Sequence, residues 1–173
     1  MRGLAALALL IAGCAPAPEP AEDPVTPVSA TDAVRLFDEI CIASAPDFVS
    51  ANRRMRDLGM TTPSASGAMV HGSGTASVKV QNRPSVGQVE VRRCSIVFQD
   101  NDSETALTTL QAIVDGRGLA RKPRKRARIG SRDVMVWDLI LDGREARMTM
   151  FLGSAATLPG SIYLEMPQLI GAA

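Results

Sequence analysis

Residues 135–150 read MVWDLILDGREARMTM, and they form the best-determined element of the predicted fold, a β-hairpin. Its central Asp142-Gly143 is typical of the two-residue type I′ turn that joins antiparallel strands. The turn pairs, along one face, Leu141 with Arg144, Leu139 with Ala146, Trp137 with Met148 and Met135 with Met150. That face is apolar except at its tip, while Asp138 lies opposite Arg147 on the other face as an opposite-charge pair. A slip of one residue would exchange the two faces, so the sequence specifies the register of this hairpin.

Apolar residues recur at helical spacing in three segments before the hairpin. Helices are therefore expected from Ser29 or Thr31 to about Ile42, from Pro46 to Gly59, and from Asp102 to Gly116. Ser29 or Thr31 can cap the first helix. Pro46 suits the first turn of the second helix, because the N–H groups of that turn have no partner within the helix and proline lacks this group. Asp47 suits the same turn, because the start of a helix favours negative charge.

Further strands are expected near 76–82, 87–98 and 162–164. In the second of these the apolar residues change phase, which a β-bulge near Arg93 would explain. Runs of strands without regular βαβ alternation indicate an α+β fold. We therefore predict one domain over residues 31–173, a mainly antiparallel sheet with about three helices.

The N-terminus carries a targeting signal. Arg2 precedes nine apolar residues from Leu4 to Ala12, a run that is too short to cross a bilayer but typical of a secretory signal peptide. The run ends at Ile11-Ala12-Gly13-Cys14, which resembles the lipobox of bacterial lipoproteins. The resemblance implies that residues 1–13 are a removable signal peptide and that Cys14 becomes lipidated on its sulfur and on its new amine, palmitate being a typical acyl chain. The alternative is an ordinary secreted protein with a coincidental cysteine.

Residues 14–30 are expected to link this lipid to the domain. Five prolines between residues 15 and 30 prevent a helix or a strand ladder, and an extended chain of this length spans on the order of 50 Å. By resemblance to lipoprotein sorting rules, Ala15 after the cysteine favours the outer membrane. We therefore expect the chain in the bacterial cell envelope, facing the periplasm.

Two cysteines remain once Cys14 is set aside. Cys41 and Cys94 are an even pair in an oxidising compartment, which predicts a disulfide between them. Two buried free thiols are the alternative. Metal-ligand spacing and a C-x-x-C motif are both lacking, so neither a metal site nor a redox site is expected.

Three features follow one another in the mature domain: Leu36-Phe37 before Cys41, then Pro46-Asp47-Phe48, and then Cys94. This arrangement resembles small two-cysteine bacterial envelope lipoproteins of uncharacterised function. It covers about residues 34–166, and it implies no activity.

The most unusual charge pattern is a basic run. The chain as a whole is balanced, with 19 basic and 18 acidic residues, but residues 117–132 hold eight cations and no acid. Such a cluster can attract anionic lipid headgroups or lipopolysaccharide, whereas nucleic acid is not expected because no aromatic residue interleaves the run for base stacking. The alternative is a solvated loop before the hairpin. The candidate contact residues are Arg121, Lys122, Arg124, Lys125 and Arg126.

No pattern indicates catalysis or a cofactor. The single histidine, His71, lies two residues before Ser73, but the G-x-S-x-G frame of a nucleophile elbow is broken there. Nucleotide-binding glycine motifs are absent from the sequence. We expect a membrane-anchored, non-enzymatic binding or structural module with an unidentified protein partner. The alternative is an inhibitor of a periplasmic enzyme, such as a lysozyme or protease, and a hydrolase comes third.

Overall fold

The computed structural model describes residues 26–62, 67–83, 89–100, 102–130, 132–152 and 159–169. The expected signal peptide, Cys14 and most of the linker lie outside the described residues. Within the described part of the chain, no helix is long and apolar enough to span a bilayer.

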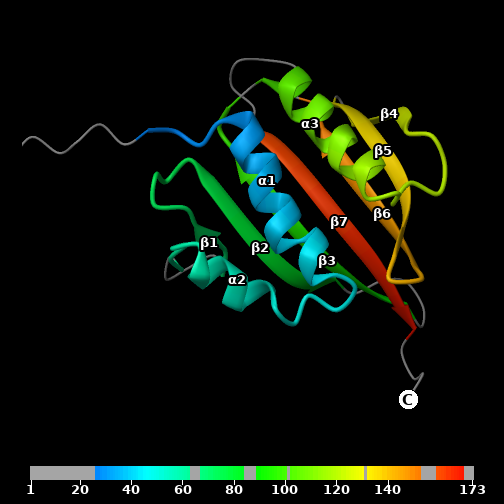
Figure 1. Ribbon diagram of the computed structural model, residues 1–173, viewed down its shortest axis with the longest axis horizontal. Coiled ribbons are helices and arrows are strands. Elements are labelled where there is room, and N and C mark those ends of the chain that lie inside the picture. Colours follow the sequence, from blue (N-terminus) through cyan, green and yellow to red (C-terminus); the bar gives the residue numbers. More distant parts are fainter. Residues whose placement is uncertain are drawn as a thin grey trace, which may run out of the picture.

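The fold is α+β, as the sequence predicts. Its helices are α1 (Ala30–Ile40), a short 3₁₀ turn η1 (Ile42–Ser44), α2 (Ala51–Asp57) and α3 (Ser103–Gly116). The strands are β1 (Met69–Val70), β2 (Ala76–Arg83), β3 (Val89–Phe98), β4 (Lys125–Ile129), β5 (Arg132–Leu141), β6 (Arg144–Phe151) and β7 (Gly160–Leu169). Helices α1 and α3 lie side by side over one face of the sheet (Figure 1).

A single seven-stranded sheet runs in the order β1-β2-β3-β7-β6-β5-β4, and every neighbouring pair is antiparallel. The last strand in sequence, β7, therefore lies in the middle of the sheet and joins β3 to β6. The outermost strands are β1 and β4.

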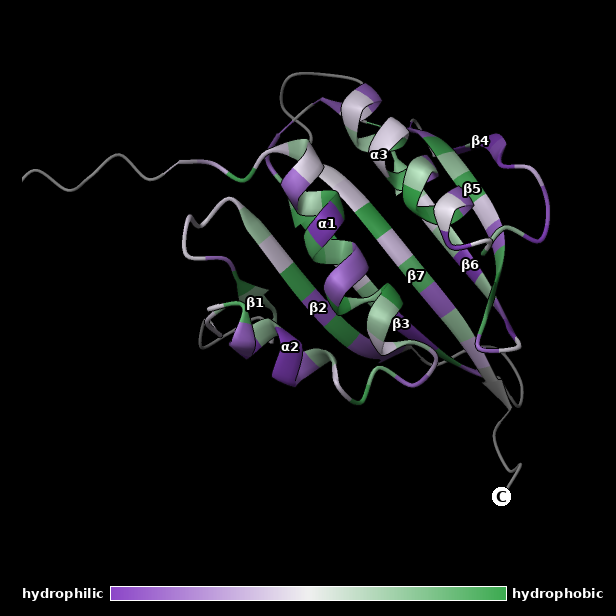
Figure 2. Cartoon of the chain, in the orientation of Figure 1, coloured by the Kyte–Doolittle hydropathy of each residue, from purple (hydrophilic) through white to green (hydrophobic). Residues whose placement is uncertain are grey.

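The hairpin forms in the predicted register. All four apolar-face pairs are present, and Asp138 lies opposite Arg147. Asp142 and Gly143 have φ angles of 51° and 74°, as a type I′ turn requires. Trp137 and Met148 are fully buried on the face that the helices cover, and hydrophobic and hydrophilic residues alternate along the strands (Figure 2).

Helix α1 is fixed to the sheet by a disulfide. The Ser29 side chain caps the helix by accepting a hydrogen bond from the Asp32 N–H at 3.1 Å. At the other end Cys41 forms a disulfide with Cys94 of β3, with 5.5 Å between the two Cα atoms. Both cysteines are fully buried. The predicted pairing is therefore confirmed, and it joins the end of α1 to the middle of the sheet.

The predicted start of the second helix is wrong. Helix α2 begins at Ala51, five residues after Pro46. Phe48 has a φ of 56°, which an α-helix does not accommodate, and its side chain is buried in the core. The segment is instead a turn in which the Asp47 carboxylate accepts a hydrogen bond from the Val49 N–H at 3.0 Å.

The predicted bulge near Arg93 is also wrong, because β3 pairs without interruption through Arg93 with both β2 and β7. The apolar residues change phase for another reason. Cys94 and Ile96 face the helices, whereas Val91 belongs to the opposite face, where a groove contains it. Helix α3 does match its prediction, from the Asp102 cap to Gly116.

Candidate functional site

The basic run forms a loop followed by the edge strand β4. All five residues of β4, Lys125 to Ile129, are exposed. Before it, the chain makes a short bridge to β5, with hydrogen bonds that join Arg121 to Asp138 and Leu119 to Ile140. Part of the basic run is therefore held in place by hydrogen bonds to β5. The alternative interpretation, a solvated loop, describes only the remaining part.

Strand geometry divides the cations between the two faces of the sheet. Arg126 pairs with the core residue Met135, so its side chain is on the helix-covered face. Lys125 pairs with Val136, and it is on the opposite face, which we call the open face. No helix of the described chain covers the open face (Figure 1). Neighbouring cations of β4 thus point in alternate directions.

Carboxylates outside the basic run neutralise part of its charge. Asp133 pairs with both Arg126 and Arg128, at 2.8 and 3.4 Å. The hydrogen bond from Arg126, with that from Arg128, holds the pKa of Asp133 below its ordinary value. Glu145 pairs with Arg121.

Arg117 pairs with Asp38 of α1 at 2.6 Å. Burial raises the pKa of Asp38, and the charge of Arg117 opposes that rise. Arg117 therefore links the end of α3 to α1 and is committed to a contact within the domain.

Three of the candidate cations have no carboxylate partner among the described residues: Lys122, Arg124 and Lys125. Arg124 donates instead to the amide oxygen of Gln111 at 3.0 Å. Since each of the three is exposed, their charge is available to a ligand. The uncompensated part of the basic run is thus smaller than the sequence indicates.

The open face carries a row of alternating charges that the sequence analysis found only in part. Register places Arg93 of β3 beside Glu165 of β7, and Glu165 beside Arg147 of β6. Arg147 in turn pairs with Asp138 of β5 at 3.5 Å, and Arg121 follows at the bridge to β5. We call these five residues the charge ladder.

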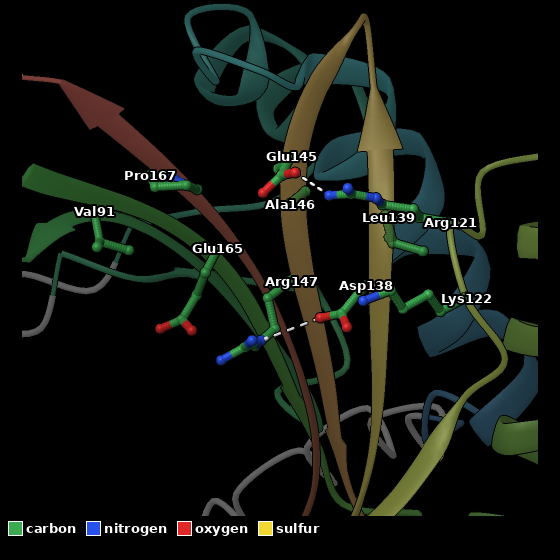
Figure 3. A pocket seen from close by; sticks show the side chains of 10 residues that line it. All are labelled: Val91, Arg121, Lys122, Asp138, Leu139, Glu145, Ala146, Arg147, Glu165 and Pro167. Carbon is green, nitrogen blue, oxygen red and sulfur yellow. Dashed lines mark hydrogen bonds and ion pairs between the residues drawn. The ribbon is translucent and has the colours of Figure 1, made fainter.

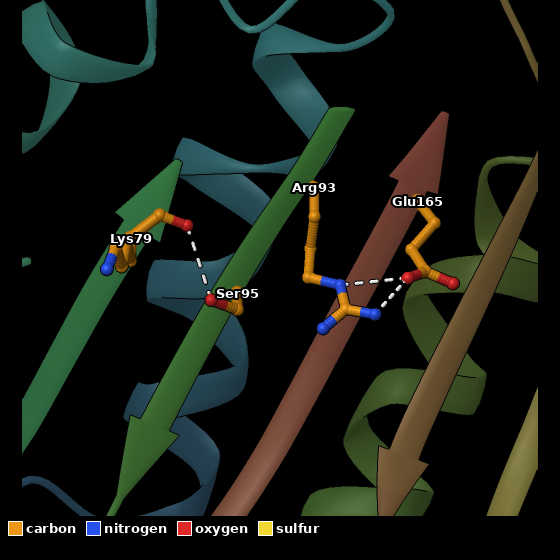
Figure 4. Close-up of polar contacts among 4 residues, drawn as sticks. All are labelled: Lys79, Arg93, Ser95 and Glu165. Carbon is orange, nitrogen blue, oxygen red and sulfur yellow. Dashed lines mark hydrogen bonds and ion pairs between the residues drawn. The ribbon is translucent and has the colours of Figure 1, made fainter. Parts of the chain in front are cut away.

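Arg93 and Glu165 form the most buried ion pair of the ladder. Arg93 Nε donates to Glu165 Oε1 at 2.8 Å, and its Nη2 reaches the same oxygen (Figure 4). The Arg93 guanidinium also lies 4.9 Å from the ring centroid of Tyr163, a cation–π distance. These contacts fix both side chains in place.

A groove of about 450 Å³ adjoins the ladder on the open face. Its lining combines both charge signs with a few apolar side chains (Figure 3). The lining residues are Val91, Arg121, Lys122, Asp138, Leu139, Glu145, Ala146, Arg147, Glu165 and Pro167.

His71 belongs to a structural hydrogen-bond network. Its Nδ1 lies 3.0 Å from the Ser73 hydroxyl, which lies 2.8 Å from the Thr75 hydroxyl. Thr75 accepts a hydrogen bond from the Val28 N–H at 2.8 Å. The network therefore fixes the start of the domain against the loop before β2. Among the described residues, no group of His, Cys, Asp and Glu side chains could hold a metal ion.

Comparisons of the chain with protein-family models, with curated proteins and with solved structures find no match.

Proposed function

We propose that this chain is a lipid-anchored protein of the bacterial envelope whose domain is a non-enzymatic binding module, and that it contacts anionic lipid headgroups through the edge that contains β4. The observation that supports the contact is the exposure of Lys122, Arg124 and Lys125 without carboxylate partners among the described residues. The lipobox-like Ile11-Ala12-Gly13-Cys14 supports the anchor.

The position of the anchor restricts how the domain meets the membrane. The described chain starts beside β2, where Val28 is hydrogen-bonded to Thr75, and β4 lies five strands away across the sheet. With about 4.8 Å between strands, the two positions are separated by roughly 24 Å, well beyond a Debye length of about 8 Å. The basic edge can therefore reach the headgroups of the same membrane when the linker, whose extended span is on the order of 50 Å, covers this distance.

Binding to vesicles tests the contact. The protein is the full-length chain with Cys14→Ser, which removes the predicted lipid attachment. Vesicles with an anionic phospholipid should bind it more tightly than uncharged vesicles, and the affinity should fall as salt rises. Lipopolysaccharide, tested separately, distinguishes the second source of anionic groups.

Two variants that each lose two positive charges separate a local contact from net charge. Arg124→Gln with Lys125→Gln should weaken binding about thirtyfold, because each cation near an anionic surface contributes about 1 kcal/mol. Arg53→Gln with Arg56→Gln, exposed on α2, should leave binding unchanged. Equal losses in both variants would reject the edge as the contact, and so would a wild type that ignores anionic vesicles at low salt.

Labelling with palmitate tests the anchor separately. The wild type should incorporate the label and fractionate with membranes, whereas Cys14→Ser should do neither. A wild-type protein that is unlabelled and released in soluble form would contradict the proposed lipid anchor and the proposed location in the envelope.

A further inference from the structure

The charge ladder keeps charged groups that no described residue pairs with. Nε and Nη2 of Arg93 both donate to Oε1 of Glu165, and Oε2 of Glu165 accepts no hydrogen bond from the described residues. Arg147 meets Asp138 only through its Nε, at 3.5 Å from Oδ1, so its terminal nitrogens have no carboxylate partner within the described chain. The Arg147 side chain is 64% exposed. The ladder can therefore pair with further charges from outside the chain.

Four members of the ladder alternate in sign across four adjacent strands. Arg93 lies on β3, Glu165 on β7, Arg147 on β6 and Asp138 on β5, each directly opposite the next in the register. All four belong to the open face, which no helix of the described chain covers (Figure 1). A row that reads positive, negative, positive, negative has opposite signs at its two ends. It is therefore complementary to a reversed copy of itself.

Symmetry decides how two copies of this row can meet. A two-fold axis that runs parallel to the strands, level with the boundary between β7 and β6, places Glu165 of each copy opposite Arg147 of the other. The same axis places Arg93 opposite Asp138. An axis along the row would place each charge opposite itself, and an axis level with a single strand would place like charges opposite each other. The order of the charges thus selects one arrangement.

The neighbouring row of the open face fits the same arrangement. It consists of Ser95, Tyr163, Thr149 and Val136, one on each of the same four strands. The axis places Tyr163 opposite Thr149 of the other copy, and Val136 opposite Ser95. Each larger side chain therefore meets a smaller one, as the inner faces of two packed sheets require when they interdigitate about 10 Å apart.

The open face is also large enough for a stable contact. The six strands from β2 to β4 span about 24 Å, and an eight-residue strand such as β6 is about 26 Å long. The resulting flat area of roughly 600 Å², to which side-chain relief adds, approaches the about 800 Å² that each partner contributes to a standard interface. Lys79 and Lys125 face each other at the outer strands, about 12 Å from the axis, where solvent screens their like charges.

We propose that the open face binds a second copy of this chain, and that the two sheets pack face to face about this axis. The terminal nitrogens of Arg147 donate to the partner's Glu165, and Asp138 pairs with the partner's Arg93. Each charge then has opposite charges beside it and across from it, which offsets the cost of removing it from water. The dimer is independent of the proposed lipid contact, because these four residues lie outside the basic run.

Sedimentation of the full-length chain with Cys14→Ser tests the dimer. We expect a monomer–dimer equilibrium. Arg147→Glu should raise the dissociation constant at least about a hundredfold, because the introduced glutamate faces the partner's Glu165 in two symmetric contacts. Arg144→Glu makes the same change on β6 at an exposed position of the helix-covered face, and it should leave the constant unchanged. A wild type that is monomeric at about 100 μM, or equal effects of both variants, would overturn the proposal.

A charge exchange identifies the facing residues. Glu165→Arg alone should also prevent the dimer, but a mixture of the Arg147→Glu and Glu165→Arg chains should form a heterodimer, because both central contacts then join opposite charges. Arg147→Gln removes the charge without reversing it, so it disturbs the sheet least and should weaken the dimer about tenfold. Unchanged association of Arg147→Gln, or a mixture of two folded variants that stays monomeric, would overturn the arrangement.

Discussion

The indole N–H of Trp137 donates a hydrogen bond to the side-chain oxygen of Gln111 at 3.0 Å, and Arg124 donates to the same oxygen from the basic run. Trp137 is fully buried in β5, and Gln111 lies on α3. One amide oxygen therefore joins the helix layer, the core of the sheet and the segment that leads into β4.

Replacing this amide should destabilise the fold. Gln111→Ala leaves the buried indole N–H of Trp137 without an acceptor, at a cost of about 1–3 kcal/mol. Urea denaturation measures the free energy of unfolding, and Trp137, the only tryptophan of the chain, reports it by fluorescence. Thr108→Ala, an exposed change on the same helix, should shift the free energy by less than about 0.5 kcal/mol. Similar losses in both variants would contradict a specific role for Gln111.

The Cys41–Cys94 disulfide should contribute strongly to stability. The two residues are 53 positions apart, and closing a loop of that length in the unfolded chain corresponds to about 4 kcal/mol. Cys41→Ala with Cys94→Ala should lower the free energy of unfolding by roughly this amount in the chain-entropy model. Peptide mapping without reductant should recover the two cysteines linked. Alkylation of both thiols in denaturant without reductant would disprove the bond.

Gly160, the first residue of β7, should not tolerate a side chain. A Cβ atom built there would lie 2.5 Å from ring atoms of Phe98, whose side chain is itself buried. Gly160→Ala should therefore destabilise the fold by about 1–3 kcal/mol. Gly116→Ala is the control, because a Cβ meets nothing within 4 Å at the end of α3. It should be neutral or slightly stabilising in the same thermal or urea denaturation.

The edge strand should respond to acid through Asp133. Its pKa is lowered in the folded chain, so the unfolded chain takes up a proton at a higher pH than the folded chain does. The resulting stabilisation is present above the unfolded pKa and disappears as the pH falls through the folded pKa. The protection factors of the β4 amides, which are corrected for the intrinsic pH dependence of hydrogen exchange, should fall over that range.

A carboxyl ¹³C titration checks the cause. Arg126→Gln with Arg128→Gln should raise the midpoint of Asp133 toward its ordinary value, because both guanidinium partners are lost. Asp102, whose pKa is lowered by its hydrogen bonds from Thr105, should titrate unchanged. A fixed Asp133 midpoint would show that the arginines do not set it.

Features governed by local sequence could be predicted. The turn residues Asp142 and Gly143 and the period of the flanking strands determine the hairpin register, and Asp102 and Gly116 mark the ends of α3. The Cys41–Cys94 pairing followed from having two cysteines left once Cys14 was set aside.

Features that depend on contacts between residues far apart in the sequence could not be predicted. Phe48 is buried with a positive φ, so α2 begins only after it. No local sequence pattern indicates this conformation of Phe48. The charge ladder needs Glu165 between Arg93 and Arg147, an adjacency that exists only because β7 lies in the middle of the sheet. The sequence analysis found Asp138 and Arg147 because one hairpin contains both.

The central position of β7 has a consequence for how the protein is made. The strands β1–β3 and β4–β6 precede β7 on the chain, and each group can pair only within itself until β7 has been synthesised. A ribosome that stalls before Gly160 would release two half-sheets, with β3 exposed in one and β6 in the other. Such open edges invite pairing with other chains, so the ten residues of β7 protect the edges of both half-sheets at once.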